Sequence, residues 1–164
     1  MFGLTPLGIV HTLISLLAVA AGAIALIRNG KISWNNHIGK IYVLTTIIVC
    51  LTGFGIFQHG GFGKPHALGI ITLLVLGIEY AANHKKFGKV SAYVETIGYS
   101  LTFFFHIVPG ITESVTRLPL DAPLASSPDD PRIQVAIGFC FLLFLIGATL
   151  QARNLRAKFV DHGQ

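Results

Sequence analysis

The chain has 164 residues, a length typical of one domain, and 52% of them are hydrophobic while only 12% are charged. About a quarter of the residues in a soluble domain are charged, so this composition excludes an ordinary soluble globule as well as a disordered chain. With two cysteines and a mean hydropathy of +0.69, a disulfide-rich secreted fold is excluded too. The sequence therefore predicts one integral membrane domain over residues 1–164.

Five apolar stretches follow one another along this chain. A helix needs about 20 apolar residues to cross roughly 30 Å of hydrocarbon, and helices satisfy their backbone polar groups within one segment. We therefore predict an all-α membrane protein, a five-span transmembrane helical bundle. The spans are expected at about residues 4–27, 38–57, 66–83, 92–111 and 133–153. Glu79 interrupts the third, and glycines such as Gly77 and Gly98 are expected to permit close helix approach.

The basic residues lie unevenly between the two faces that five spans create. Three of the twelve, Lys64, Arg117 and Arg132, fall on the face that carries the N-terminus. The positive-inside rule then places the N-terminus outside and the C-terminus in the cytoplasm, across a bacterial inner membrane. Topology accounts for the basic excess, so nucleic acid is not an expected partner. The nine basic residues of the other face are Arg28, Lys31, Lys40, Lys85, Lys86, Lys89, Arg153, Arg156 and Lys158.

The longest connection, residues 113–132, is expected on the outer side. It contains Pro119, Pro123, Pro128 and Pro131. Proline lacks a backbone N–H and interrupts helices, so we predict an extended cap over the outer end of the bundle.

Histidines are the candidate functional residues, because ionisable groups at membrane depth are costly and are kept for function. His11 and His106 each lie about two turns below the outer end of their spans. At the inner face, His37 opens the second span and His84 closes the third. The outer group consists of His11, His59, His66, His106 and Glu113.

Four segments stand in the order and spacing of a known family. They are Gly22 with His11, His37-x-Gly39-Lys40-x-Tyr42-Val43, Gly61-Phe-Gly-Lys-Pro-His66, and Glu113-x-x-x-Arg117-Leu-Pro119. With these residues the chain resembles, over about residues 8–119, the bacterial integral-membrane family catalogued as domain of unknown function 2306. The resemblance implies the membrane topology and draws attention to His11, His37 and His66. Members carry Arg after the histidine of the second span, where this chain has Ile38.

The first functional hypothesis is a redox protein that binds b-type haem and exchanges electrons with a quinone. Two imidazoles on facing helices at one depth can hold a haem between apolar walls. His11 and His106, with His66 nearby, are the predicted ligands at the outer side. His37 and His84 are the predicted ligands of an inner haem.

The second hypothesis is a single zinc or copper site at the outer side. Neutral imidazoles suit both metals, and three ligands with an open position form a catalytic arrangement. His11, His66 and His106 would bind the metal, with His59 or Glu113 as a further ligand or general base. Such a site could hydrolyse or oxidise a lipid-borne substrate.

The third hypothesis is a non-catalytic accessory subunit or proton-coupled carrier. It would bind other membrane subunits or a second copy of itself within the lipid bilayer. Its histidines would be bonded to carbonyls or water, and Glu79 and Glu95 would relay protons, as intramembrane carboxyls often do.

Overall fold

The computed structural model describes residues 5–57, 61–119 and 121–161. These residues form five α-helices and one short 3₁₀ helix, and they contain no strand, which confirms the all-α prediction. The elements are α1 (Pro6–Asn29), α2 (His37–Gly53), α3 (Lys64–Asn83), η1 (Gly88–Val90), α4 (Ser91–Arg117) and α5 (Pro131–Asp161).

Three of the helices are long and apolar enough to cross a membrane: Pro6–Asn29, Lys64–Asn83 and Pro131–Val160. The distribution of side chains agrees with a membrane protein. Large apolar residues face outward, with Ile27 84% and Val135 72% exposed, whereas Thr46 and Thr102 are completely buried. A soluble protein rarely exposes apolar patches on this scale.

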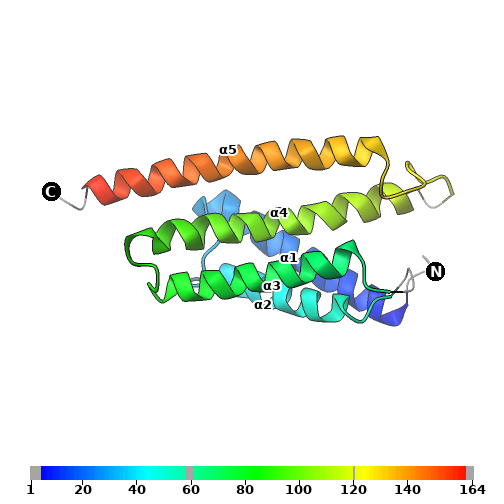
Figure 1. The fold of residues 1–164 in the computed structure, drawn as a ribbon, viewed down its shortest axis with the longest axis horizontal. Helices are drawn as coiled ribbons and strands as arrows, with labels where there is room; N and C mark the ends of the chain where they lie inside the picture. The colour runs from blue at the N-terminus through cyan, green and yellow to red at the C-terminus, as the bar shows by residue number, and fades with distance from the viewer. Residues whose placement is uncertain (1–4, 58–60, 120, 162–164) are drawn as a thin grey trace.

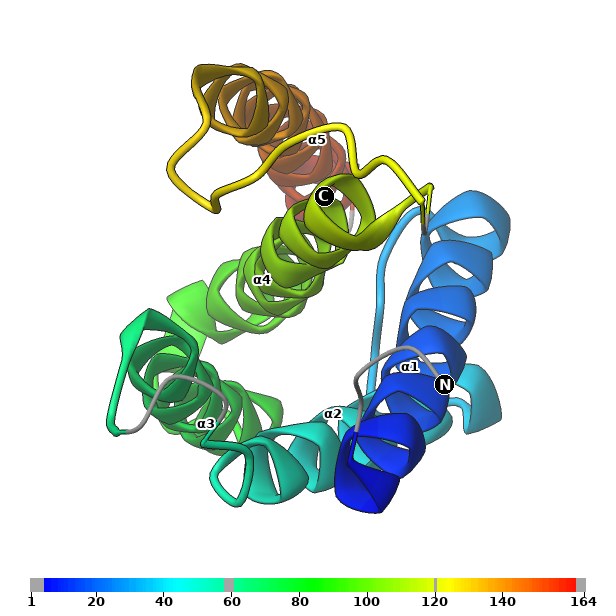
Figure 2. The same cartoon turned by 90° about the vertical axis from the view of Figure 1, so that its right-hand side faces the viewer.

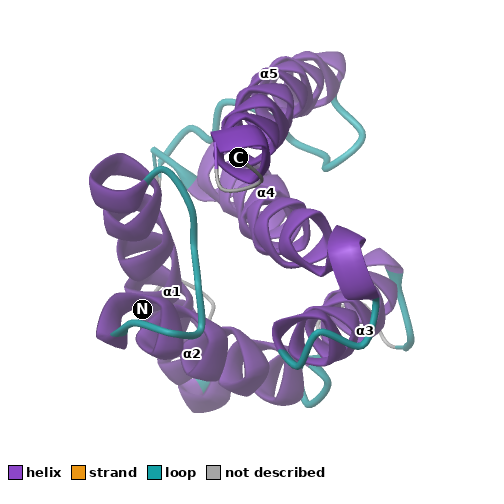
Figure 3. Cartoon of the chain, turned by 90° about the vertical axis from the view of Figure 1, so that its left-hand side faces the viewer, coloured by secondary structure: helices purple, strands orange, loops and turns teal. Residues whose placement is uncertain are grey.

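Successive helices run antiparallel, and α1 to α4 surround a common interior (Figures 1 and 2). Helix α5 lies outside this group and packs against α4 (Figure 2). The start of α1 and the ends of α2 and α4 lie at one end of the bundle, here called the loop end (Figure 1). The connections after α1 and α3 and the end of α5 lie at the opposite end, here called the basic end (Figure 3). All nine basic residues predicted to share a face belong to the segments at the basic end.

Helix α4 extends beyond the expected span 92–111 and includes the first residues of the connection expected at 113–132. It continues past Pro109 to Arg117. Proline removes only one backbone donor, and the last turns gain other contacts. The Thr116 hydroxyl donates to the Thr112 carbonyl at 2.7 Å, and Glu113 pairs with Arg117 one turn away. Helix α2, by contrast, ends at Gly53 rather than at residue 57.

The shortened connection after α4 folds back on the bundle. The Ala125 N–H donates to the Val115 carbonyl at 3.1 Å, and Lys64 at the start of α3 pairs with Asp129 at 2.9 Å. Asp130 accepts hydrogen bonds from the side chain and the backbone N–H of Arg132, which lower the pKa of Asp130 to about 2. These contacts tie the loop to α3, α4 and α5.

The connection between α1 and α2 passes very close to the first turn of α2. Asn36 caps this helix and accepts from the Gly39 N–H at 2.8 Å. A Cβ atom at Gly39 would lie 1.8 Å from the Ser33 carbonyl oxygen. Only glycine fits at this position.

We therefore expect Gly39→Ala to lower the free energy of unfolding by about 3 kcal/mol, because the clash involves backbone. Thermal unfolding in detergent measures the effect. The matched control is Gly138→Ala in α5, where a Cβ meets no atom within 4 Å and alanine favours the helix by about 1 kcal/mol. Equal unfolding midpoints for the two variants would contradict the close approach.

Candidate functional site

Polar side chains are buried along α2, α3 and α4. They include Thr46, His66, Thr72, Glu79, Thr96, Ser100, Thr102 and His106. A polar group in apolar surroundings costs free energy unless it is hydrogen-bonded. The partners of these groups therefore separate the structural residues from the candidates for function.

Two side-chain hydrogen bonds join α2 to α4 across the bundle. The Tyr42 hydroxyl bonds the Thr102 hydroxyl at 2.9 Å, and the Thr46 hydroxyl bonds His106 Nε2 at 3.0 Å. Each bond joins residues sixty positions apart, so the two helices run parallel in a fixed register. The backbones of α2 and α4 are not in contact. The four side chains therefore bridge the interior between two helices that lie on opposite sides of the bundle. The His106 ring also packs edge-on against Tyr42, with 6.0 Å between centroids.

His11 is held by the same face of α2. Its Nδ1 lies 3.0 Å from the Thr52 hydroxyl, and its ring packs beside Gly53. Thr46 and Thr52, the contact points of His106 and His11, are six residues apart, which is about 9 Å along a helix. The two histidines nevertheless lie within electrostatic reach of one another. A haem held by His11 and His106 stays a prediction from the sequence.

Of the remaining outer residues, Glu113 lies within electrostatic reach of His11. His66 is buried between the rings of Phe57 and Phe62, and its Nδ1 accepts from the Gly63 N–H at 3.2 Å. Glu113 pairs with Arg117 near the end of α4, and His59 lies outside the described residues. Across the described parts of the chain, no three His, Cys, Asp or Glu side chains gather as a metal site would require. A zinc or copper site remains a prediction from the sequence.

The inner histidines lie on the surface of the basic end. His37 is the exposed first residue of α2. His84 caps α3 and is exposed, with its Nδ1 2.9 Å from the Tyr80 carbonyl oxygen. No contact between the two is present in the described structure, and an inner haem also stays a prediction.

Among the described residues, both carboxyl oxygens of Glu79 are buried without a hydrogen-bond partner, and His66 Nε2 is the other buried side-chain atom that lacks one. Glu79 is completely buried. Its side chain packs against Gly98 of α4, where a Cβ would lie 2.7 Å from Oε1. The carboxyl is within electrostatic reach of Tyr42 and Tyr99. An unpaired intramembrane carboxyl of this kind is a candidate for function.

A second carboxyl lies nearby but is well bonded. Glu95 accepts from the Ser33 hydroxyl at 3.1 Å and from the Asn83 side-chain amide at 3.2 Å. Asn83 is one turn beyond Glu79 on α3. The Glu95 network thus fixes the wall of the bundle next to the unpartnered carboxyl.

A mostly apolar pocket of about 390 Å³ opens between α2, α3 and α4. Leu76 and Asn83, which share a face of α3 with Glu79, line it, and so does Tyr99 of α4. Trp34, the only tryptophan of the chain, forms part of its wall. The other lining residues are Val43, Ile47, Leu73, Gly77 and Tyr80.

Sequence reasoning overlooked Tyr42, Tyr99 and Thr102. The sequence does contain a signal for two of them, because Glu95, Tyr99, Thr102 and His106 follow one another at steps of four, three and four residues. This spacing places all four on one face of α4. A search restricted to histidines does not detect it.

Comparison of the chain with protein-family models, with curated proteins and with solved structures gave no match.

The contact of Glu79 with Gly98 gives a direct test. We expect Gly98→Ala to lower the free energy of unfolding by about 1–3 kcal/mol, because its methyl group would displace the carboxyl. Gly110→Ala in the same helix is the matched control, since a Cβ there meets no atom within 4 Å. Thermal unfolding of both variants in detergent, compared with the double variant Gly98→Ala/Glu79→Ala, measures the effect. A double variant no more stable than Gly98→Ala would show that the carboxyl is not the group displaced.

Proposed function

We propose that this chain crosses a bacterial inner membrane five times, with its N-terminus outside and its C-terminus in the cytoplasm. Three helices have the length and apolarity of spans. Helix α2 has 17 residues, about 25 Å, and the 27-residue α4 is about 40 Å long. Both lie alongside the apolar helices, and the basic residues at one end support the orientation.

We further propose that the protein binds a quinone in the pocket between α2, α3 and α4. The observation that carries this proposal is the unpartnered Glu79 carboxyl behind an apolar, aromatic pocket wall. A volume of about 390 Å³ lies within the usual range for small-molecule sites, which combine apolar walls with a few polar groups. A quinone ring matches this pattern, since its faces are apolar and its two carbonyl oxygens accept hydrogen bonds. Asn83 and Tyr99 supply polar groups in the lining.

The proposed role of Glu79 is proton exchange with the bound ring. Reduction of a quinone to a quinol adds two electrons and two protons to its carbonyl oxygens. The electrons would come from a redox protein of the same membrane, with which this chain would act as an accessory subunit. A carboxyl that is not engaged by other residues is free to give up and take back a proton.

This proposal keeps the quinone of the first sequence hypothesis and leaves the haem as an untested prediction. An absorption spectrum of the protein purified in mild detergent tests that prediction. A Soret band that sharpens on reduction and is lost in His106→Ala would place the electron carrier within this chain. Metal assay of the same sample tests for zinc or copper.

Trp34 allows the binding proposal to be measured directly. We expect a short-chain quinone to quench Trp34 fluorescence in detergent with saturation. Gly77→Leu should weaken this binding at least about tenfold, because Gly77 lines the pocket and has open space beside it. Gly138→Leu, at an open position on α5, is the matched control. Quenching that never saturates, or is equal in the two variants, would refute the pocket as the quinone site.

The proton-exchange role has its own test. Glu79→Gln keeps the shape of the side chain but cannot exchange a proton, so quinone affinity by Trp34 quenching should stay within about twofold. The midpoint potential of the bound quinone should vary less steeply with pH in this variant than in the unaltered protein. An identical pH dependence would exclude Glu79 as the proton-exchanging group while leaving quinone binding intact.

A further inference from the structure

Glu79 lies much closer to the basic end of the bundle than to the loop end. It is four residues from the last residue of α3 and fifteen residues from the first. At the rise of an α-helix these separations are about 6 Å and about 22 Å. A proton that reaches or leaves this buried carboxyl therefore has its shorter path at the basic end.

The next polar level in that direction contains a second carboxyl. Glu79 packs against Gly98 of α4, and Glu95 precedes Gly98 by three residues on the same side of that helix. On α3, Asn83 follows Glu79 by four residues and donates to Glu95 Oε1 at 3.2 Å. The two carboxyls are thus separated along the helices by roughly 5–6 Å, and they lie within electrostatic reach of one another.

One water molecule can bridge a gap of this length. Two O–H···O hydrogen bonds of about 2.8 Å that share one water span up to about 5.6 Å. The hydrogen bonds from Ser33 and Asn83 both end on Glu95 Oε1, so neither of them engages Oε2. Glu95 is also partly exposed, whereas Glu79 is completely buried. Glu95 therefore stands between Glu79 and the solvent at the basic end.

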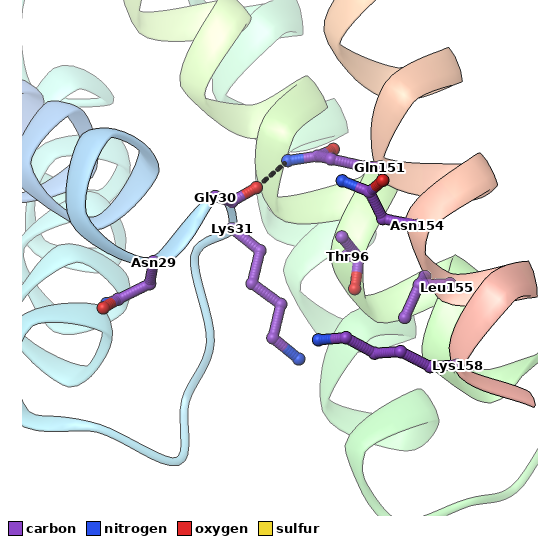
Figure 4. Close-up of a pocket in the computed structure, with 8 residues that line it drawn as sticks. All are labelled: Asn29, Gly30, Lys31, Thr96, Gln151, Asn154, Leu155 and Lys158. Carbon is purple, nitrogen blue, oxygen red and sulfur yellow. Dashed lines mark hydrogen bonds between the residues drawn. The ribbon is translucent and has the colours of Figure 1, made fainter. Parts of the chain in front are cut away.

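A recess at the basic end lies beside the same turn of α4. Its volume is about 100 Å³, and Thr96, the residue after Glu95, lines it together with Lys31 (Figure 4). Gln151 of α5 bounds the recess and donates to the Gly30 carbonyl at 2.9 Å (Figure 4). A space of this volume with polar groups in its wall is large enough for water. Water can thus approach the Glu95 turn from the basic end.

Toward the loop end, the nearest hydroxyl groups donate to backbone carbonyls. The Thr102 hydroxyl, which bonds the Tyr42 hydroxyl, donates to the Tyr99 carbonyl at 3.0 Å. The Thr46 hydroxyl donates to the Tyr42 carbonyl at 2.7 Å. A backbone carbonyl accepts a hydrogen bond but has no proton to pass on. These hydroxyls therefore do not continue a proton path from Glu79 to the loop end.

We propose that Glu95 carries protons between the basic end and Glu79. Glu79 gives its proton to a carbonyl oxygen of the quinone ring as the ring is reduced, and is left as a carboxylate. A proton then moves from the Glu95 carboxyl through one water to Glu79, and bulk water at the basic end returns a proton to Glu95.

This relay rests on the proposed proton-exchange role of Glu79 and deepens it. The carrier hypothesis from the sequence names both carboxyls, and their spacing now gives the order in which they act. With the proposed orientation in the membrane, the basic end faces the cytoplasm, so the protons would be taken from that side.

Deuterium exchange followed by infrared spectroscopy tests the relay on the full chain, in detergent and without quinone. The carbonyl stretching band that Glu79→Gln removes reports the protonated Glu79 carboxyl, and its shift after rapid mixing into heavy water gives the exchange rate. We expect Glu95→Gln to slow this exchange at least about tenfold, because a positioned acid or base contributes about 10²–10⁴-fold to proton transfer. Glutamine keeps an oxygen that can accept from Ser33 and Asn83, so the fold should be retained.

Two further variants separate proton transfer from a structural effect. Glu95→Asp keeps a carboxyl at this position and should exchange faster than Glu95→Gln. The matched control, Lys89→Gln, removes one exposed charge from the same end and should exchange at the unaltered rate. An unaltered rate in Glu95→Gln, equal slowing in Lys89→Gln, or no recovery in Glu95→Asp would overturn the relay.

The same spectra distinguish failure of the relay from failure of the proposed function. If Glu79→Gln removes no carbonyl band, Glu79 holds no proton to pass on, and the relay and the proton-exchange role are both wrong. Saturable quenching of Trp34 by quinone in that case would show that quinone binding stands without them.

Discussion

The hydrogen bonds between α2 and α4 set the frame on which the rest of the bundle depends. Two side-chain hydrogen bonds with the same sequence spacing join these helices, one between Tyr42 and Thr102 and one between Thr46 and His106. In hydrocarbon there is no water to satisfy a polar side chain that loses its partner. These two hydrogen bonds therefore hold α2 and α4, which lie diagonally opposite each other in the bundle, in a fixed register. Helices α1 and α3 each pack against both of them. His106, which the sequence predicts as a ligand, is hydrogen-bonded to Thr46 in this frame.

Unlike the hydrogen-bonded side chains between α2 and α4, the Glu79 carboxyl has no hydrogen-bond partner among the described residues. Its burial without a bonded partner costs stability, and the chain makes room for it by placing Gly98 opposite. Strain or cost of this kind is commonly found where a protein needs a reactive group in an apolar site. The adjoining pocket supplies the apolar walls and the aromatic rings that a quinone would require. The pocket and the costly unpaired carboxyl thus lie in the same short stretch between α3 and α4.

The two ends of the bundle are built differently. At the loop end, Lys64 and Asp129 form an exposed ion pair, which contributes at most about 1 kcal/mol. At the basic end, Gln151 joins α5 to α4 and to the end of α1 through two hydrogen bonds and bounds a recess beside the first turns of α4. The outermost helix, α5, is thereby attached at the end from which Glu95 would take up protons.

The sequence by itself determined the helical class and the approximate position of every helix, because uncharged apolar runs near 20 residues have few alternatives. It did not determine the end of α4, since Thr116 and Glu113 bonds outweigh the local effect of Pro109. Nor did it determine the partners of His11 and His106. Position along a span gives depth, but the rotation of a helix and the register with its neighbours decide which groups meet. Only the tertiary structure decided that Thr46 and Thr52 bind these histidines while Glu79 is left without a partner.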